Sequence, residues 1–194
     1  MIFPPLASKK VILASSSPRR QQLIKELGVD FEVRTKEVEE IYPEGLKRED
    51  IATFLAKLKA DAFDRSELAD GEILVTADTI VCLGDEVLMK PKDYADAVRI
   101  LKQLSNDKHQ VITGLCLKSN DKEIVVFVST DVYFKKLNKD EISYYLDTYK
   151  PFDKAGAYGI QEWIGYIAIE KIEGSFYNVM GLPIQRLYEE LLNF

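Results

Sequence analysis

The chain has 194 residues, of which 46% are hydrophobic, and its formal net charge is −6. The apolar and aromatic content excludes a disordered chain, and the negative charge argues against duplex nucleic acid as the main partner. No apolar run approaches the roughly 20 residues of a membrane-spanning helix. We therefore expect a soluble globular protein with no membrane or nucleic-acid partner.

Residues 11–20 (VILASSSPRR) predict a short apolar strand, a serine loop and the start of a helix. Ser17 is typical of an N-cap and Pro18 of a first helical position. Arg19 and Arg20 then place two cations at the helix end where the dipole and the unsatisfied N–H groups favour an anion. This combination predicts a phosphate-binding site. The alternative is that both arginines point outward and pair with acidic residues of a neighbouring loop.

The remaining elements alternate between strand and helix in the first half of the chain and include a long hairpin in the second half. The nearly continuous apolar run at 73–83 predicts a strand buried on both faces. Asn138 followed by Glu141 predicts a capping box, and two β runs joined by SNDK predict an antiparallel hairpin. Strands are predicted at 31–33, 73–83, 110–118, 123–135 and 164–172, and helices at 51–63, 93–104, 141–149 and 183–192.

The two cysteines and the N-terminal segment indicate the compartment. Cys82 and Cys116 lie in strand-like runs without CxxC spacing, which is typical of buried thiols in a reducing environment. The N-terminal segment MIFPPLASKK is too short and too polar for a signal peptide. We expect a cytoplasmic protein.

Asp78 interrupts the apolar strand ILVTADTIVCL, where a carboxylate is disfavoured and is expensive to bury without a partner. Such a residue could be a general base that takes a proton from water, or a metal ligand. The alternative is an aspartate satisfied by a structural lysine or by loop N–H groups. Thr79 beside it can be interpreted simply as a β-branched strand residue.

Other polar residues each have a functional interpretation and a structural alternative. Glu40 lies in an acidic loop, and such carboxylates hold Mg²⁺ together with substrate phosphates, although most acidic loops are only solvated. Lys90 and Lys154 could contact phosphate, but isolated lysines usually face solvent. Gln161 could read the edge of a nucleobase with its amide, or be solvated in its turn. His109 is the only histidine, which excludes triads and His-based metal sites.

Several segments together resemble the ordered signatures of the Maf proteins. The resemblance extends over residues 14–183 and implies one Maf-like domain, residues 1–194, with an α/β fold similar to that of the inosine triphosphate pyrophosphatases. That fold has a mixed sheet with flanking helices and two lobes around a central cleft, the second lobe being centred on about residues 110–150. The segments are SSSPRR, the VEE that ends at Glu40, LAKLKA, TADTIV, MKPKD, HQVITG, PFDKAGAYGIQ and GSFYNVMGLP.

The resemblance implies a nucleoside triphosphate pyrophosphatase that releases a monophosphate and pyrophosphate. The form PxDKAGAYGIQ resembles the branch that acts on dTTP and UTP rather than on 7-methyl-GTP, with CTP and modified pyrimidine nucleotides left open. A divalent cation, Mg²⁺ or Mn²⁺, and a homodimer are also implied.

The resemblance also implies a role for individual residues, position by position. Asp78 matches the proton acceptor, and three residues match positions tied to base selectivity: Arg19, Thr79 and Gln161. Four residues match polar positions that line the cleft: Glu40, Lys59, Lys90 and Lys154. Ser15, Ser17 and Arg20 are expected to hold phosphate, and Glu40 or Asp78 the metal.

One departure from the family pattern is GIQEW, in which Glu162 and Trp163 replace a glycine-rich continuation. A lone glutamate is expected to be exposed, but it would alter selectivity if it faced the base. Two other functions stay open: a non-catalytic nucleotide-binding regulator of septum formation in cell division, and hydrolysis at the γ-phosphorus. Asp78 distinguishes an enzyme from the regulator, because a sensor needs no carboxylate that activates water. Product identity distinguishes the two hydrolyses.

Overall fold

The computed structural model describes residues 6, 7 and 9–194. The expectation about the segment MIFPPLASKK falls partly on residues 1–5 and 8, which lie outside the described residues. The chain divides into two compact units. The first unit comprises Met1–Asp78, Thr113–Val128 and Gly181–Phe194, and the second unit comprises Thr79–Ile112 and Ser129–Met180. No helix of the described residues is long and apolar enough to cross a membrane.

In the part of the chain that the structure describes, seven strands form one mixed sheet in the order β2-β1-β3-β5-β6-β7, with β4 paired to β3. β1 runs parallel to β2 and β3, whereas β4 is antiparallel to β3 and β7 to β6. The predicted mixed sheet with flanking helices is confirmed, and the central cleft stays a prediction. The strands are β1 (Lys10–Leu13), β2 (Asp30–Val33), β3 (Glu72–Leu83), β4 (Glu86–Leu88), β5 (Lys108–Lys118), β6 (Glu123–Phe134) and β7 (Ile169–Glu173).

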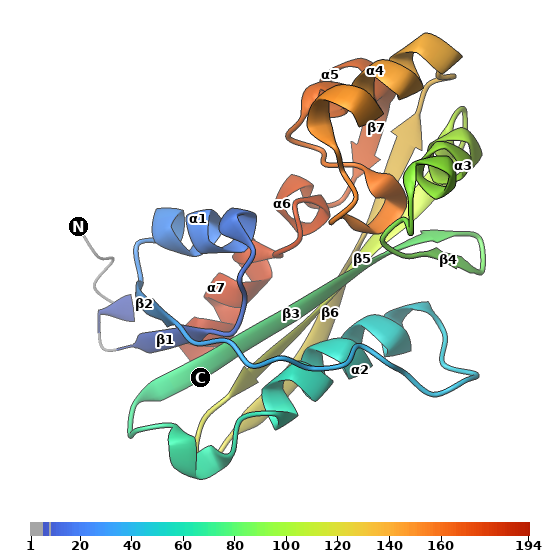
Figure 1. The fold of residues 1–194 in the computed structure, drawn as a ribbon. Helices are drawn as coiled ribbons and strands as arrows, with labels where there is room; N and C mark the ends of the chain where they lie inside the picture. Colours follow the sequence, from blue (N-terminus) through green and yellow to red (C-terminus); the bar gives the residue numbers. More distant parts are fainter. Residues whose placement is uncertain (1–5, 8) are drawn as a thin grey trace. The chain divides into compact units, whose positions relative to one another are not determined.

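The first unit packs helices on both faces of its strands. Figure 1 shows α2 on one side of these strands and α1 and α7 on the other. Successive strand residues point to opposite faces, which lets one strand serve both layers. On the α2 side, Ile12 and Leu74 pack with Ala56 and Ala60 in a fully buried cluster. The helical segments of this unit are α1 (Pro18–Leu27), α2 (Arg48–Asp61), the 3-10 helix η2 (Arg65–Glu67) and α7 (Ile184–Asn193).

The second unit has its own apolar core, in which residues of α3 and α4 pack with strand residues such as Val81 and Val132. The predicted capping box is confirmed, because Asn138 and Glu141 exchange two hydrogen bonds of 2.9 Å at the start of α4. The helical segments of this unit are α3 (Tyr94–Leu104), α4 (Lys139–Tyr149), the 3-10 helix η3 (Ala155–Ala157), α5 (Trp163–Ala168) and α6 (Phe176–Val179).

The strand predicted at 164–172 is wrong in its first half, which forms α5, and only β7 follows as a strand. Ile164 and Ala168, four residues apart, are both fully buried, which is the spacing of one helix face. A short apolar run does not by itself distinguish a buried strand from a buried helix. The signature segment GSFYNVMGLP contains the short helix α6.

Candidate functional site

The loop between β1 and α1 presents the predicted serines to the start of the helix. α1 begins with Pro18 and ends at Leu27, and it is capped by Gly28, whose φ of 71° is the left-handed conformation that favours glycine. The Ser15 hydroxyl accepts a hydrogen bond of 3.3 Å from the Ser17 N–H, within the loop itself. As far as the described residues go, the Ser17 side chain makes no capping hydrogen bond. The Ser17 side chain therefore does not occupy the first backbone N–H groups of α1, and such groups suit an anion.

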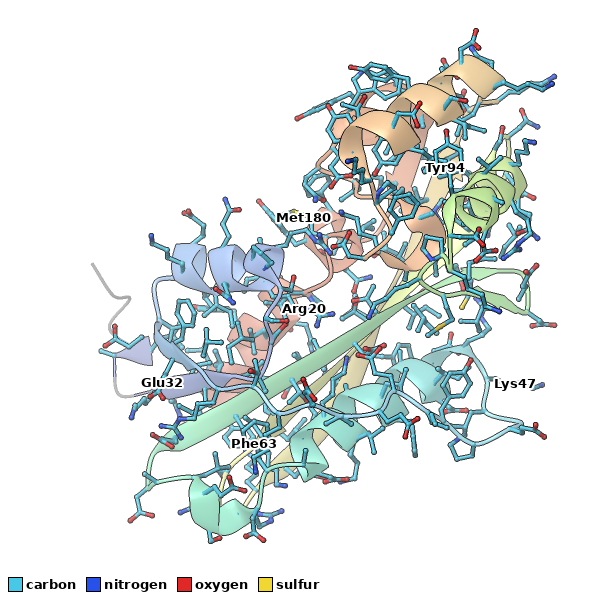
Figure 2. The ribbon with its side chains drawn as sticks, viewed as in Figure 1. Arg20, Glu32, Lys47, Phe63, Tyr94 and Met180 are labelled. Carbon is cyan, nitrogen blue, oxygen red and sulfur yellow. The ribbon has the colours of Figure 1, made fainter. Side chains whose placement is uncertain are left out.

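Arg20 extends from α1 toward β3 (Figure 2) and holds two backbone segments. Its Nε donates to the carbonyl oxygen of Gly181 at 2.7 Å, and its Nη1 donates to that of Ala77 at 2.8 Å. Burial lowers the pKa of the Arg20 guanidinium, and Asp78 opposes this effect. Because Ala77 directly precedes Asp78, Arg20 fixes the backbone next to that carboxylate. Arg19 is partly buried beside it in the helix.

Lys59 of α2 brings two of the predicted carboxylates together. Its Nζ lies 2.9 Å from Oε1 of Glu40 and donates a hydrogen bond to Oδ1 of Asp78. Asp78 is only 7% exposed, so it is a buried carboxylate with a charged partner. The structural alternative for Asp78, an aspartate satisfied by a lysine, thus describes its local contact. The same contact places two anionic groups around one ammonium.

The meeting of Lys59 and Asp78 follows from the way α2 packs on β3. Thr76 and Asp78 are two residues apart in the strand and point to the same face, whereas Ala56 and Lys59 are three apart on one helix face. The buried Thr76 hydroxyl donates to the carbonyl oxygen of Ala56 at 2.6 Å. This bond sets the register between helix and strand, and the next pair along the contact is Lys59 with Asp78.

The two carboxylates fit a cation that is bound together with a phosphate. Mg²⁺ is usually held by one or two carboxylates and by substrate phosphates, rather than by a cage of protein ligands alone. Glu40 and Asp78 converge on one lysine and supply that number of carboxylates. Among residues 6, 7 and 9–194, no group of three or more His, Cys, Asp and Glu side chains could hold a metal ion.

The second unit contains the other predicted residues. Thr79 is partly buried in β3, and Lys90 is exposed after β4. Lys154, by contrast, is buried, so the solvent-facing alternative is wrong for this lysine. Its Nζ lies 2.8 Å from Oδ1 of Asp153 and 3.1 Å from Oε1 of Glu162. Lys154 is therefore a buried cation held by carboxylates at the start of η3.

Gln161 carries a buried acceptor. Its side-chain oxygen has no hydrogen-bond partner among the described residues. Buried polar atoms are nearly always paired, and an unpaired one is unfavourable unless a bound molecule completes it. The burial of this oxygen argues against the alternative of a solvated turn, and base reading by Gln161 stays a prediction.

Two residues of this region did not appear among the predicted site residues. Glu162 was expected to be exposed, but its side chain is 17% exposed and accepts a hydrogen bond from the Tyr145 hydroxyl as well as pairing with Lys154. Tyr145 is itself fully buried in α4. The signal in the sequence was the departure from the family pattern at Glu162. Its partners could not be inferred, because they come from residues 8 and 17 positions away in the chain.

Several proteins named dTTP/UTP pyrophosphatase align with this chain over nearly its whole length. The chain is 54% identical over 193 residues to a protein of Flavobacterium psychrophilum named dTTP/UTP pyrophosphatase, covering 100% of this chain and 98% of the relative. Relatives of the same name from Parabacteroides distasonis and Porphyromonas gingivalis are 51% and 47% identical, each covering 97% of this chain and 98% and 96% of the relative. The solved structure of the Staphylococcus aureus Ham1 protein has a TM-score of 0.44 and 15% identity, over 65% of this chain and 72% of that chain. That likeness is too weak to support an inference.

A family model described as Maf-like protein matches residues 10–194. This range begins at β1 and includes the serine loop, the contact of Lys59 with Asp78, and the turn that carries Gln161. Since the match extends over nearly the whole chain, and the relatives align over nearly their whole length, the chain belongs to the family of Maf-like proteins.

Proposed function

We propose that this protein hydrolyses dTTP and UTP to the corresponding monophosphate and pyrophosphate. The observation that carries the proposal is the identity of about half of all residues to proteins named dTTP/UTP pyrophosphatase, over nearly the whole of both chains. The site supports the same chemistry, because it combines a buried carboxylate with serines, arginines and lysines that suit a triphosphate.

Asp78 is the proton acceptor in this proposal. A water oxygen attacks the α-phosphorus, the bond from that phosphorus to the oxygen bridging to the β-phosphorus breaks, and pyrophosphate leaves. The proton of the water passes to the Asp78 carboxylate. Lys59 donates to Oδ1 of Asp78 and thereby fixes the orientation of the carboxylate, and we assign Oδ2 to the water.

Phosphate binding is assigned to residues of each unit. In the first unit, Ser15, Ser17 and Arg19 lie at the start of α1, where N–H groups and the helix dipole favour an anion. Arg20, whose guanidinium also donates to the carbonyl oxygens of Gly181 and Ala77, is assigned to phosphate as a positive charge. In the second unit, the exposed Lys90 and the buried Lys154 are assigned to phosphate as point charges. 

Base selectivity is assigned to Gln161, with Thr79 and Arg19 as further contributors. The buried Gln161 oxygen lacks a donor within the described residues. Uracil and thymine offer an N–H at ring position 3, whereas cytosine has an acceptor there. A site built to accept a hydrogen bond discriminates strongly against a ligand that lacks the donor. We therefore expect dTTP and UTP to be better substrates than CTP.

A divalent cation, Mg²⁺ or Mn²⁺, is part of the proposal. Glu40 and Asp78 are the residues that would hold it, since hard cations prefer carboxylate oxygens and complete their shell with phosphate oxygens and water. When bound, the cation neutralises charge on the triphosphate and on the leaving pyrophosphate. Lys59 then serves to hold the two carboxylates close together.

Product analysis tests the proposed reaction. The purified protein is incubated with Mg²⁺ and, separately, dTTP, UTP, CTP, GTP, ATP, ITP and 7-methyl-GTP, and the products are separated by anion-exchange chromatography. We expect monophosphate and pyrophosphate from dTTP and UTP. Diphosphate and orthophosphate would instead indicate attack at the γ-phosphorus. Binding without turnover would favour the regulator of septum formation and would remove the catalytic role of Asp78.

We also infer a homodimer and a cytoplasmic location. The homodimer rests on the family resemblance, and size-exclusion chromatography with light scattering tests it. The location is supported by Cys82 and Cys116, which are both buried thiols, as expected in a reducing compartment.

A further inference from the structure

Glu162 connects groups of the second unit that the proposed function treats separately. Its Oε1 lies 3.1 Å from Nζ of Lys154, and its Oε2 accepts a hydrogen bond from the Tyr145 hydroxyl. The same hydroxyl oxygen accepts from the N–H of Gly159 at 3.0 Å. Burial, reinforced by the bond to Glu162, raises the pKa of Tyr145. The hydroxyl therefore stays protonated and links the Gly159 backbone to the carboxylate.

The turn from Gly159 to Glu162 carries Gln161, and it is closed by a 3.0 Å hydrogen bond from the Glu162 N–H to the Gly159 carbonyl oxygen. A Cβ on Gly159 would lie 2.9 Å from Cδ of Glu162 and 3.0 Å from Nε2 of Gln161. Ordinary contacts begin at 3.4 Å. The carboxylate of Glu162 and the amide of Gln161 thus both fold back over one glycine, so a displacement of either side chain disturbs the other.

We propose that Glu162 is a positioning residue that couples base reading by Gln161 to phosphate binding by Lys154. This inference rests on the proposed function of the same site. An ammonium has three donors, and within the described residues Asp153 and Glu162 are the carboxylate partners of Lys154. The third donor is assigned to a phosphate oxygen.

Of the two carboxylates, Glu162 determines where the ammonium lies. Asp153 is 64% exposed, and solvent screens an ion pair of that kind, whereas Glu162 is 17% exposed. Glu162 is also held on its other oxygen by Tyr145. A change at Glu162 should therefore move Lys154 and the Gln161 turn together.

The variant Glu162→Gln tests the coupling with two independent readouts. The amide keeps an oxygen that can accept from Tyr145, but it lacks the charge that holds Lys154. Inorganic tripolyphosphate, which has no base, reports on phosphate binding through its inhibition constant. We expect that constant to rise, and the preference for dTTP over CTP in kcat/KM to fall, each by about 3- to 10-fold, with kcat for dTTP little changed. A merely structural loss of active enzyme would lower kcat but leave the inhibition constant and the preference for dTTP over CTP unchanged.

Other variants separate the two arms of the coupling. Gln161→Ala should change the base preference but leave tripolyphosphate inhibition unchanged, and Lys154→Gln should weaken tripolyphosphate inhibition more than it alters base preference. Gly159→Ala should reproduce the double effect of Glu162→Gln, because the added methyl group displaces flexible side-chain ends rather than backbone. It also keeps the test decisive if Glu162→Gln does not fold.

The second unit offers a matched control with the same three residue types. The Tyr133 hydroxyl donates to Oε2 of Glu173 at 2.6 Å, and Nζ of Lys171 donates to Oε1 at 2.5 Å, all at the surface. Glu173→Gln should leave the inhibition constant and the base preference unchanged.

The inference is overturned if folded Glu162→Gln and Gly159→Ala keep both the wild-type inhibition constant and the wild-type base preference. It is also overturned if only one of these two quantities changes in both variants. Failure of the wild-type protein to hydrolyse dTTP would overturn the proposed function instead. Calorimetric binding of tripolyphosphate to the wild type and to Glu162→Gln would then still decide whether Glu162 positions Lys154.

Discussion

Because Lys59 contacts one oxygen of Asp78, a substitution at Asp78 can test catalysis separately from nucleotide binding. Asp78→Asn keeps the size of the side chain and an oxygen that can accept from Lys59, but an amide does not take a proton from water. We expect kcat for dTTP to fall by about 10²- to 10⁴-fold, the usual contribution of a general base. Binding of a non-hydrolysable dUTP analogue, measured by calorimetry, should change little.

Asp61→Asn is the control for the Asp78 substitution. Asp61 pairs with Lys57 at 3.0 Å in the same unit, but this pair is exposed. The control should keep wild-type kcat, because an exposed ion pair contributes little to stability or orientation. Normal turnover in Asp78→Asn would remove Asp78 from the mechanism.

His109 is a buried residue whose neutral form the fold requires. Its Nε2 lies 2.8 Å from the Tyr158 hydroxyl, and its ring makes edge contacts with Phe134 and Tyr158. Burial lowers the pKa of His109 from 6.5 to about 4, although Asp107 and Asp131 act in the opposite direction. The unfolded chain therefore takes up this proton at a higher pH than the folded chain. The contribution of neutral His109 to stability is complete above pH 6.5 and is lost as the pH falls toward 4.

His109→Gln should remove this pH dependence. In the wild type, the shift corresponds to at most about 3 kcal/mol of unfolding free energy between pH 7 and pH 4. Urea unfolding at half-unit pH steps measures it, and the curve of His109→Gln should be flatter between pH 6.5 and 4. Tyr158→Phe keeps the histidine but removes its hydroxyl partner, so it should keep the fall. Equal slopes in His109→Gln and the wild type would contradict the assignment.

At the scale of elements, Gly114 of β5 lies close to the backbone of α2. A Cβ at this position would lie 2.1 Å from the carbonyl oxygen of Ala52 and 2.7 Å from the backbone nitrogen of Thr53. Backbone atoms of a packed helix cannot move aside as a side-chain end can. Gly114→Ala should lower the unfolding free energy by about 3 kcal/mol or more, since overpacking of a tight contact has this effect. Urea unfolding followed by circular dichroism measures the change.

Gly84→Ala shows what part of such a loss comes from the backbone alone. Nothing lies within 4 Å of a Cβ there, but φ is +59°. The expected loss is the left-handed penalty of about 1–2 kcal/mol. A smaller effect at Gly114 than at Gly84 would mean that α2 can move away from the sheet easily.

Elements with local signals could be predicted from the sequence, and those determined by packing could not. Pro18 marked the start of α1, and Asn138 with Glu141 marked the start of α4. These residues act through the backbone within a few positions of themselves. Within the described part of the chain, no side chain caps α5, and its six residues are apolar or glycine apart from one tyrosine hydroxyl. Its helical form depends on the burial of one face, and this burial cannot be inferred from such a short apolar sequence.

At the scale of the whole molecule, the same distinction applies to the site. Asp78 and Glu40 could be singled out by residue type and by resemblance, and Lys59 by resemblance alone. Their contact depends on the register between α2 and β3, which no local signal specifies. Glu162 shows the limit most clearly, because its burial follows from a tyrosine and a lysine that lie far from it in the sequence.

The two units contain acid-sensitive groups that titrate in different pH ranges. His109 belongs to the second unit, whereas Glu72 belongs to the first. Glu72 is 3% exposed and accepts from Arg34 at 2.9 Å and from Lys10 at 2.7 Å, bonds that join β3 to β1 and to the residue after β2. Hydrogen bonds from Arg34 and then Lys10 lower the pKa of Glu72 from 4.5 to about 2. Its stabilising effect is complete above pH 4.5 and is lost between 4.5 and about 2.

Acid should therefore weaken the second unit before the first. Trp163, the single tryptophan, reports on the second unit, and amide exchange in β1 reports on the first. Between pH 7 and pH 5, the urea midpoint seen by Trp163 fluorescence should fall, while protection of β1 amides, corrected for intrinsic exchange, should stay constant.

Glu72→Gln should weaken β1 protection at pH 7 by about 1–3 kcal/mol, and this difference should shrink below pH 4.5. Glu32→Gln removes a 49% exposed partner of the same arginine and should have a smaller effect. A fall in β1 protection that accompanies the tryptophan transition at pH 5 would contradict this separation, because the stabilising effect of Glu72 is complete above pH 4.5.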